Sequence, residues 1–256
     1  MTQNYSIQVY NYSGAPRNYL LFQTVPVPSG QPNVFTNVYQ SSGIVQSGNY
    51  SEVTFQMTDE FFAVYGANPT PLGDHVRVIT GSAEPVTLSS GEKPPEQPGT
   101  MCVMTTTQGE YPAWEKVSQT QQTEPNAYCI SCDGTFNYPT ERKSSCSFLP
   151  ANLQNTANIF IGMGAPDPYT QFIIPVATVP ASPNYNFYFQ PIVKYYIGTG
   201  DFEAGTVVNV TEIGPVLTVD FTQLPGNTAV YTQGQDNEYT LGPPSDTEAV
   251  KGHKKQ

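Results

Sequence analysis

The sequence predicts an all-β protein, and three observations support this fold class. The 256-residue chain contains 24 Pro and 21 Gly, and these interrupt its apolar runs about every ten residues, which is the spacing of strands and turns. No window shows apolar residues at i, i+3, i+4 and i+7 over a helical length. The third observation is a loose internal repeat, which predicts that one β unit has been duplicated.

The repeat is an ordered series of matches rather than one strong motif. Residues 49–66 recur loosely as residues 184–200, and the tripeptide Gly-Ala-Pro at 14–16 recurs at 164–166. Each match is weak alone, but their common order favours duplication. We therefore predict a duplicated β-sandwich made of two pseudo-symmetric antiparallel β units, with a loop-rich insert between the copies.

This interpretation divides the chain into four regions. They are the first β unit (1–88), a Cys- and Pro-containing insert (89–150), the second β unit (151–241) and a disordered tail (242–256). The insert is too long for a plain connection in a compact domain, and long loops on β scaffolds often carry function. It is therefore the first place to search for a site.

Period-2 patterns and turn residues place the individual strands. In the first unit we expect strands at 5–12, 19–27, 33–40, 50–57, 60–66, 74–80 and 84–89. In the second unit we expect them at 157–163, 171–179, 185–193, 194–199, 206–212 and 215–222. Residues 51–57 alternate clearly, with Val53, Phe55 and Met57 on one face. Residues 186–192 are more apolar, which is typical of a strand covered on both sides.

The distribution of charge excludes several classes of partner. The net charge is −11, residues 1–88 contain only Arg17 and Arg77 as basic residues, and residues 151–250 contain only Lys194. The β units therefore cannot form the basic stripe that nucleic acids and anionic membranes require. The sequence has no apolar run of 18 residues, and its first residues show no leader pattern, so we expect a cytoplasmic protein.

The four cysteines, all in the insert, allow three interpretations. Cys129 and Cys132 form a C-x-x-C, with Cys102 and Cys146 nearby in the sequence. Four thiolates could hold zinc, but the second pair lacks the C-x-x-C spacing, and a thioredoxin-like pair would require a βαβ context. One or two structural disulfides are the second interpretation. We favour the third, thiols without a catalytic role, and expect no metal.

Catalytic and cofactor motifs are scarce. The chain has two histidines, His75 and His253, so a histidine metal site cannot be built and a Ser-His-Asp triad would depend on His75. Asp74 and His75 replace a Thr-Val pair of the second unit, but neighbours in a strand point to opposite faces, and we expect a solvated strand start. Phosphate-binding glycine motifs are missing and the carboxylates form no evident pair, so we expect no cofactor.

The aromatic residues point to a ligand site in the insert. Seventeen Tyr, 13 Phe and one Trp accompany abundant amide and hydroxyl side chains, a mixture that suits carbohydrate or planar organic ligands. The insert has no counterpart in the repeat, yet it contains the only Trp. We therefore hypothesise that Trp114 and Tyr128 are the aromatic walls of a site, with Glu115 or Asp133 as its polar anchor.

Two functions are compatible with these patterns. The Tyr- and Asn-rich, basic-poor composition is similar to that of lectin-like β proteins, and favours a non-enzymatic module that binds a neutral glycan or another polar or aromatic small ligand. The alternative is a cofactor-independent cyclase or isomerase acting on an apolar small molecule, which needs only a shaped pocket. A shallow site repeated in both β units would favour the first function, and one deep apolar cavity would favour the second.

Overall fold

The protein is all-β, as predicted. The computed structural model describes residues 2–26, 34–107, 111–119, 124–135 and 158–245, and within them the only helical element is a 3-10 turn, η2 (Val210–Glu212). The strands are β1 (Asn4–Asn11), β2 (Arg17–Gln23), β3 (Phe35–Thr36), β4 (Gln40–Val45), β5 (Glu52–Thr58), β6 (Phe61–Asn68), β7 (Ser82–Val86), β8 (Thr100–Thr107), β9 (Tyr111–Gln119), β10 (Tyr128–Cys132), β11 (Asn158–Pro166), β12 (Ile173–Pro180), β13 (Tyr185–Phe189), β14 (Lys194–Thr199), β15 (Leu217–Asp220), β16 (Thr228–Gln233) and β17 (Tyr239–Leu241).

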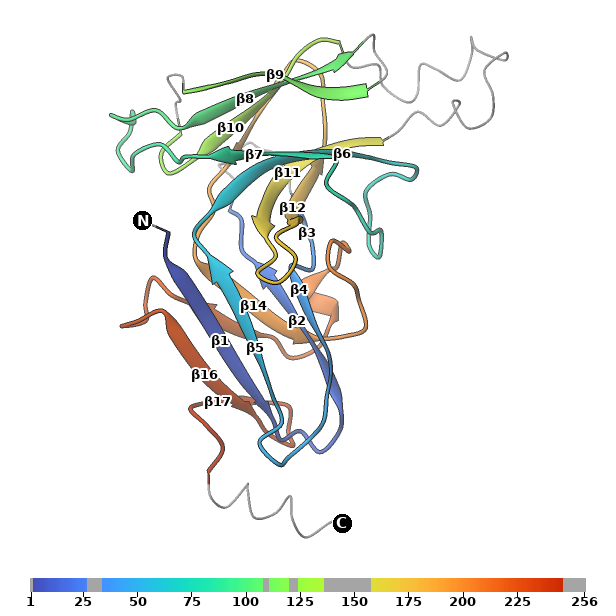
Figure 1. Ribbon diagram of the computed structural model, residues 1–256, viewed down its shortest axis with the longest axis vertical. Coiled ribbons are helices and arrows are strands. Elements are labelled where there is room, and N and C mark those ends of the chain that lie inside the picture. The colour runs from blue at the N-terminus through green and yellow to red at the C-terminus, as the bar shows by residue number, and fades with distance from the viewer. Residues whose placement is uncertain (1, 27–33, 108–110, 120–123, 136–157, 246–256) are drawn as a thin grey trace.

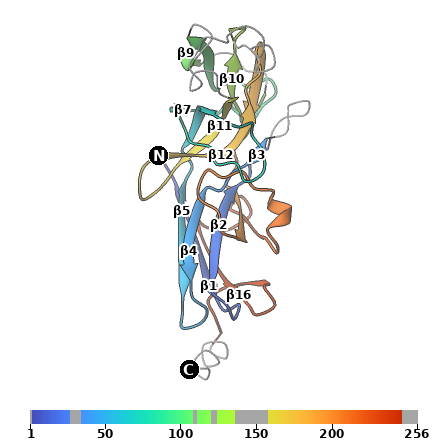
Figure 2. The ribbon, with the colours of Figure 1, turned by 90° about the vertical axis from the view of Figure 1, so that its right-hand side faces the viewer.

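These strands form four sheets that pack as two sandwiches. The lower sandwich pairs the sheet β17-β16-β1-β5 with the sheet β15-β14-β2-β4, and the upper sandwich pairs β3-β12-β11-β6-β7 with β13-β10-β8-β9. Figure 1 shows the two sandwiches stacked along the long axis of the molecule, and Figure 2 shows the same stack from the side. We call the level at which they meet the waist.

The lower sandwich follows the predicted alternation of residues. Phe55 and Met57 on β5 are both buried and face the core, while Gln56 between them is exposed. On the facing sheet, Leu21, Tyr195 and Ile197 are fully buried against them. Burial of such side chains stabilises the fold by roughly 1.5–3 kcal/mol each.

The described part of the insert is not loop-rich, contrary to the prediction, because it supplies strands to the upper sandwich. The described part of the insert contains β8, β9 and β10, which form one complete sheet together with β13. Cys102 and Met104 alternate inward on β8. Cys and Met are not among the residues enriched in strands, so the inward face of β8 did not mark it as a strand.

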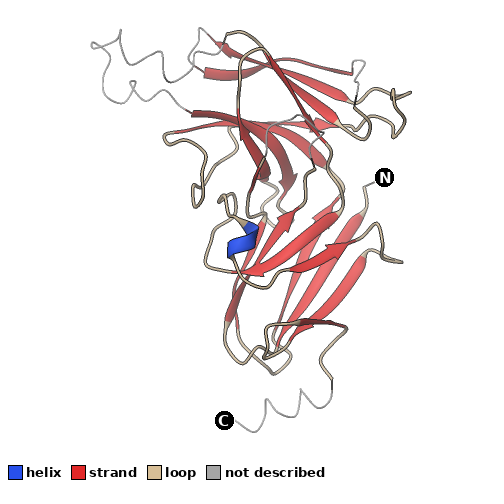
Figure 3. Ribbon diagram, turned by 180° about the vertical axis from the view of Figure 1, so that it is seen from behind, coloured by secondary structure: helices blue, strands red, loops and turns tan. Residues whose placement is uncertain are grey.

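The chain passes repeatedly between the two sandwiches. It runs from β2 in the lower sandwich to β3 in the upper one and returns to β4, then crosses again from β5 to β6 and from β13 to β14. Figure 3 shows the two sandwiches from behind. Neither sandwich is therefore a continuous segment of the sequence.

The sheet order does not confirm the predicted duplication. β1 lies between β5 and β16, whereas its expected counterpart β11 lies between β12 and β6. The strands β1 and β2 belong to different sheets, but β11 and β12 are hydrogen-bonded neighbours. The sequence matches therefore fall on strands with different neighbours.

The expected strands at 74–80 and 206–212 are not strands. These two segments instead contact each other through an isolated bridge between Arg77 and Thr206. His75 has a positive φ of 66°, and Asn209 caps η2 by accepting a hydrogen bond from the backbone N–H of Thr211. Local turn chemistry thus overrides the extended pattern at both places.

Other strand predictions were wrong in extent. The expected strand at 33–40 is only Phe35–Thr36 in the described structure, and the longer β4 begins at Gln40. In the strand β13, Phe187 and Phe189 are buried while Asn186 is exposed, so the strand is covered on one face rather than on both. The strands β16 and β17 lie where no strand was expected, and residues 246–256 of the expected tail lie outside the described residues.

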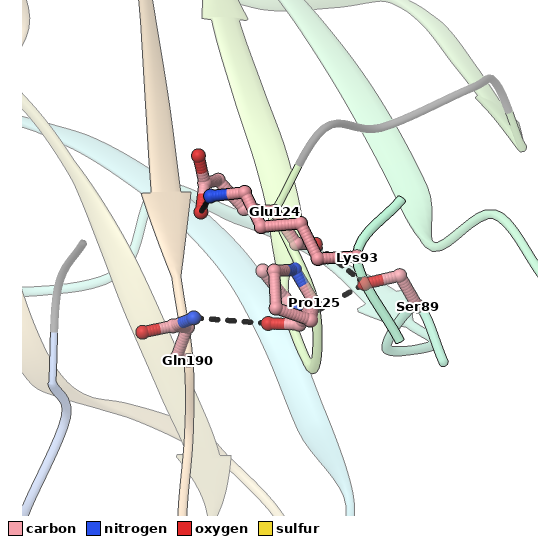
Figure 4. A network of polar contacts seen from close by, with 6 residues as sticks. Ser89, Lys93, Glu124, Pro125 and Gln190 are labelled. Atoms are coloured by element: carbon pink, nitrogen blue, oxygen red, sulfur yellow. Dashed lines mark hydrogen bonds and ion pairs between the residues drawn. The ribbon is translucent and has the colours of Figure 1, made fainter. Parts of the chain in front are cut away.

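A network of polar contacts fixes the start of the insert (Figure 4). The hydroxyl of Ser89 donates a 2.7 Å hydrogen bond to the carbonyl oxygen of Glu124 and accepts one from the backbone N–H of Ala127. The amide of Gln190 donates to the carbonyl oxygen of Pro125 at 2.9 Å. The loop before β10 is therefore attached both to the segment after β7 and to the end of β13.

Candidate functional site

Trp114 lies on β9, the edge strand of its sheet, and packs inward. Its ring meets that of Tyr65 edge-on, with centroids 4.9 Å apart, and it contacts the buried core. Its indole nitrogen is buried without a hydrogen-bond partner among the described residues. Trp114 therefore connects the two sheets of the upper sandwich.

The other three predicted site residues do not gather around Trp114. Tyr128 is fully buried, stacks on Phe189 with ring centroids 5.4 Å apart, and donates a hydrogen bond to the carbonyl oxygen of Gly162. It therefore presents no face to a ligand. Glu115 is exposed and follows Trp114 on the strand, so the two side chains point to opposite faces.

The carboxylate of Asp133 takes part in the hydrogen bonds of a turn. Its carboxylate accepts hydrogen bonds from the backbone N–H and hydroxyl of Thr135, at 2.9 and 2.5 Å. Burial raises the pKa of Asp133, but the hydrogen bonds from Thr105 and Thr135 outweigh it and lower the pKa below its ordinary value. The carboxylate of Asp133 therefore has a structural partner after β10.

The described thiols are buried core groups. Cys102, Cys129 and Cys132 are free, and burial raises the pKa of each from 9.0 to about 12. Because Cys129 and Cys132 are three positions apart on one strand, their side chains point to opposite faces and cannot chelate one ion. No cluster of three metal-binding side chains occurs in the part of the chain that the structure describes. Cys146 lies outside that part.

His75 is an exposed residue of a turn, and it contacts one neighbouring aromatic ring. Its ring stacks on that of Phe202, with centroids 5.1 Å apart, and its backbone N–H donates to the carbonyl oxygen of Val207. The expected strand start is therefore a turn, although Asp74 and His75 are both exposed to solvent as predicted.

The waist contains a rigid loop that sequence reasoning missed. This waist loop, residues 167–172, joins β11 to β12 and points toward the lower sandwich (Figure 1). The carboxylate of Asp167 accepts hydrogen bonds from the backbone N–H groups of Tyr169 and Thr170, at 2.9 and 2.7 Å. The loop therefore holds two aromatic side chains, Tyr169 and Phe172, in the open at 73% and 72% exposure.

A groove of about 520 Å³ lies on one side of the waist loop. We call it the first groove. The loop contributes Asp167 and Tyr169, and the 203–204 segment faces them. Its lining residues are Gln40, Ser41, Ser42, Val53, Thr54, Phe55, Arg77, Asp167, Tyr169, Glu203 and Ala204.

A second groove of about 470 Å³ borders the same loop. Both volumes fall within the range of about 300–1,000 Å³ that is usual for ligand sites. Its lining residues are Asn4, Tyr5, Ser6, Gln56, Met57, Thr58, Glu60, Pro166, Pro168, Gln171, Asn227 and Thr228. Hydroxyl and amide side chains form the majority of the second lining set and slightly less than half of the first.

The charged groups of the first groove are already paired. Arg77 forms an ion pair with Glu203 and also donates to the carbonyl oxygen of Ala204. The carboxylate of Asp167 is held by its turn. Neither lining set contains a histidine or a cysteine, so these residues offer hydrogen bonds and an aromatic face rather than a nucleophile with its base.

The sequence contained a signal for the waist loop. The run 166–172 reads Pro-Asp-Pro-Tyr-Thr-Gln-Phe, in which Asp-Pro favours a turn. Two aromatic residues in a turn between apolar strands are unusual, because exposure of a large ring brings no gain in stability. The predicted strand at 171–179 included Phe172, so this residue was not recognised as part of a turn.

The fold and the grooves together define the class of this protein. It is an elongated all-β protein of two interleaved sandwiches with polar grooves at its waist. The model of the RhiA family matches residues 2–243, so the chain belongs to the RhiA family. No curated protein and no solved structure matches the chain. Among the described residues, no helix has the length and hydrophobicity needed to cross a membrane.

Proposed function

We propose that this protein is a non-enzymatic, lectin-like module that binds a neutral glycan in the first groove. The observation that carries the proposal is the exposed ring of Tyr169, which a hydrogen-bonded loop holds beside hydroxyl and amide groups. An aromatic face covers the apolar side of a sugar ring, while neighbouring polar groups bind its hydroxyls.

The hydrogen-bonding groups of the first groove support this ligand class. Ser41 and Ser42 lie on β4 and donate to neighbouring protein acceptors. The hydroxyl of Ser42 also accepts a 2.8 Å hydrogen bond from the backbone N–H of Tyr19, so Ser41 has the more available lone pairs for a sugar hydroxyl. The hydroxyl of Thr54 on β5 adds a further donor and acceptor. These groups stand on strands, which fixes their positions before a ligand binds.

The charges support a neutral ligand. Arg77 is the only basic residue that lines either groove, and its charge is balanced by Glu203. An acidic sugar would meet Asp167 and Glu203 without an unpaired cation to offset the repulsion. The free thiols of the buried cysteines are typical of a reducing compartment, and we accordingly propose a cytoplasmic location.

A binding experiment tests the proposal. We expect labelled protein to bind neutral oligosaccharides on a glycan array, with the affinity confirmed by calorimetry. Tyr169→Ala should weaken binding about tenfold, which corresponds to the roughly 1.4 kcal/mol expected for loss of an aromatic contact.

Phe172→Ala is the matched control. Phe172 is as exposed as Tyr169 and belongs to the same loop, but it does not line the groove. This variant should retain its affinity. Absence of binding to every glycan tested, or equal affinity of the Tyr169→Ala variant and the unmodified protein, would contradict the proposed function.

A further inference from the structure

The two grooves are neighbours on a single strand. Val53, Thr54 and Phe55 of β5 line the first groove, and the next three residues of the same strand, Gln56, Met57 and Thr58, line the second. At a rise of about 3.4 Å per residue, these six residues extend over about 17 Å. One strand thus forms a wall common to both grooves.

The waist loop is the second shared wall. Asp167 and Tyr169 face the first groove, while Pro166, Pro168 and Gln171 face the second. The loop therefore stands at the boundary between the grooves, close to the point where β5 passes from one to the other.

Two hydrogen bonds hold this boundary in place. The side-chain amide of Gln40 in the first groove donates a 2.7 Å hydrogen bond to the carbonyl oxygen of Gln56 in the second. The hydroxyl of Tyr39 donates a 2.7 Å hydrogen bond to the carbonyl oxygen of Pro166. The spacing of the two grooves is consequently fixed before any ligand arrives.

The second groove shares the polar groups of the first but has no exposed aromatic ring, since its only aromatic residue, Tyr5, is buried. Asn4, Ser6, Asn227 and Thr228 supply amide and hydroxyl groups. Glu60 is the only charged residue in the lining, and its carboxylate accepts a hydrogen bond from the hydroxyl of Thr2. A segment of the same neutral polymer could therefore occupy both grooves.

We propose that the two grooves are consecutive subsites for one extended neutral oligosaccharide, which lies along β5 and passes the foot of the waist loop. This inference rests on the proposed function of the first groove and adds a second binding site and a ligand of minimum length. Once the first groove is occupied, the next sugar units meet the second groove at high effective concentration, because rigid protein sets the distance.

Affinity as a function of chain length tests the inference. The probes are malto-oligosaccharides and cello-oligosaccharides of two to eight units, measured by calorimetry with the full-length protein. We expect affinity to rise at least tenfold between the short and the long members of the series that binds. One long oligosaccharide should bind per protein molecule.

A blocking variant separates the two grooves. Thr228 is exposed and lines the second groove, so Thr228→Arg should reduce the affinity of long oligosaccharides to that of short ones and leave the short ones unchanged. Thr218→Arg is the control, because Thr218 is an exposed strand threonine that lines neither groove. This control should bind both probe classes with unchanged affinity.

The possible failures are distinguishable. If neither series binds at any length, both the proposed function and the inference are wrong. If a series binds but its affinity is independent of length, or two short molecules bind per protein without any gain for the long ones, the inference alone fails. Unchanged affinity of long oligosaccharides for the Thr228→Arg variant would also overturn it.

Discussion

The hydroxyl of Tyr39 donates a 2.7 Å hydrogen bond to the carbonyl oxygen of Pro166, at the residue from which the waist loop begins. Tyr39 is almost fully buried between β3 and β4, and Pro166 ends β11. A buried side chain thus supports the loop that separates the two grooves, although the residues are 127 positions apart in the sequence.

Removal of this hydroxyl should weaken both the fold and the grooves. We expect Tyr39→Phe to lower the free energy of unfolding by about 1 kcal/mol, the usual net contribution of such a hydrogen bond. Urea unfolding measures this change. Tyr195→Phe is the matched control, because the buried hydroxyl of Tyr195 has no partner among the described residues and its loss should cost no stability. Equal destabilisation by the two changes would contradict the assigned role of Tyr39.

Trp114 should contribute to stability and not to ligand binding. We expect Trp114→Ala to lower the free energy of unfolding by about 3 kcal/mol, because the indole packs between the sheets of the upper sandwich against Tyr65. Glycan affinity at the waist should be unchanged. Intact stability with lost binding would contradict this prediction and would mean that Trp114 belongs to the ligand site.

Gly162 should be intolerant of any side chain. A Cβ at this position of β11 would lie 2.0 Å from the carbonyl oxygen of Ala177 on the neighbouring strand, so the backbone would have to shift. We expect Gly162→Ala to destabilise the protein by about 1–3 kcal/mol. Gly73→Ala is the control, since a Cβ there meets no atom within 4 Å. Thermal unfolding of the two variants should separate them clearly.

The buried thiols should be inert in the folded protein. In a Cys146→Ser variant only Cys102, Cys129 and Cys132 remain, and burial raises the pKa of each to about 12. Because the thiolate is the reactive form, we expect no labelling by a disulfide reagent at pH 8 until denaturant is added. Rapid labelling of the native variant would show that a thiol is exposed and ionised.

Stability should decline in alkali for the same reason. The pKa of each thiol is about 12 in the folded state and near 9.0 when exposed, so the unfolded chain releases protons first as the pH rises. The contribution of these thiols is complete below pH 9 and is lost progressively between about pH 9 and pH 12. Urea unfolding at pH 8, 10 and 11 measures the slope, which should be shallower in a Cys129→Ala variant.

The sequence predicted the strands better than their arrangement. Alternation identified β5, with Phe55 and Met57 inward, because a period of two is a local property. Sheet order is not local. The repeat between the segments that contain β1 and β11 therefore did not predict that these strands would have different neighbours.

The sequence predicted which kinds of side chain form the candidate site, but not where in the fold they lie. Aromatic and polar side chains were expected together, and Tyr169 is surrounded by such groups at the waist. The choice of Trp114 and Tyr128 assumed that an insert without a counterpart lies outside the core. The structure instead uses β8 and β10 as a sheet of the upper sandwich, and Tyr128 fills its interior.

The parallel pairing of β1 with β16 determines when this protein can complete its fold. Ser6 and Thr228 are register partners separated by 222 positions, and their hydroxyls are hydrogen-bonded. During synthesis, the N-terminal strand must wait for almost the whole chain to leave the ribosome before that edge is covered. Pairings of such long sequence separation fold slowly and expose strand edges meanwhile. Until β16 pairs with it, the edge of β1 on that side is open to pairing with other chains.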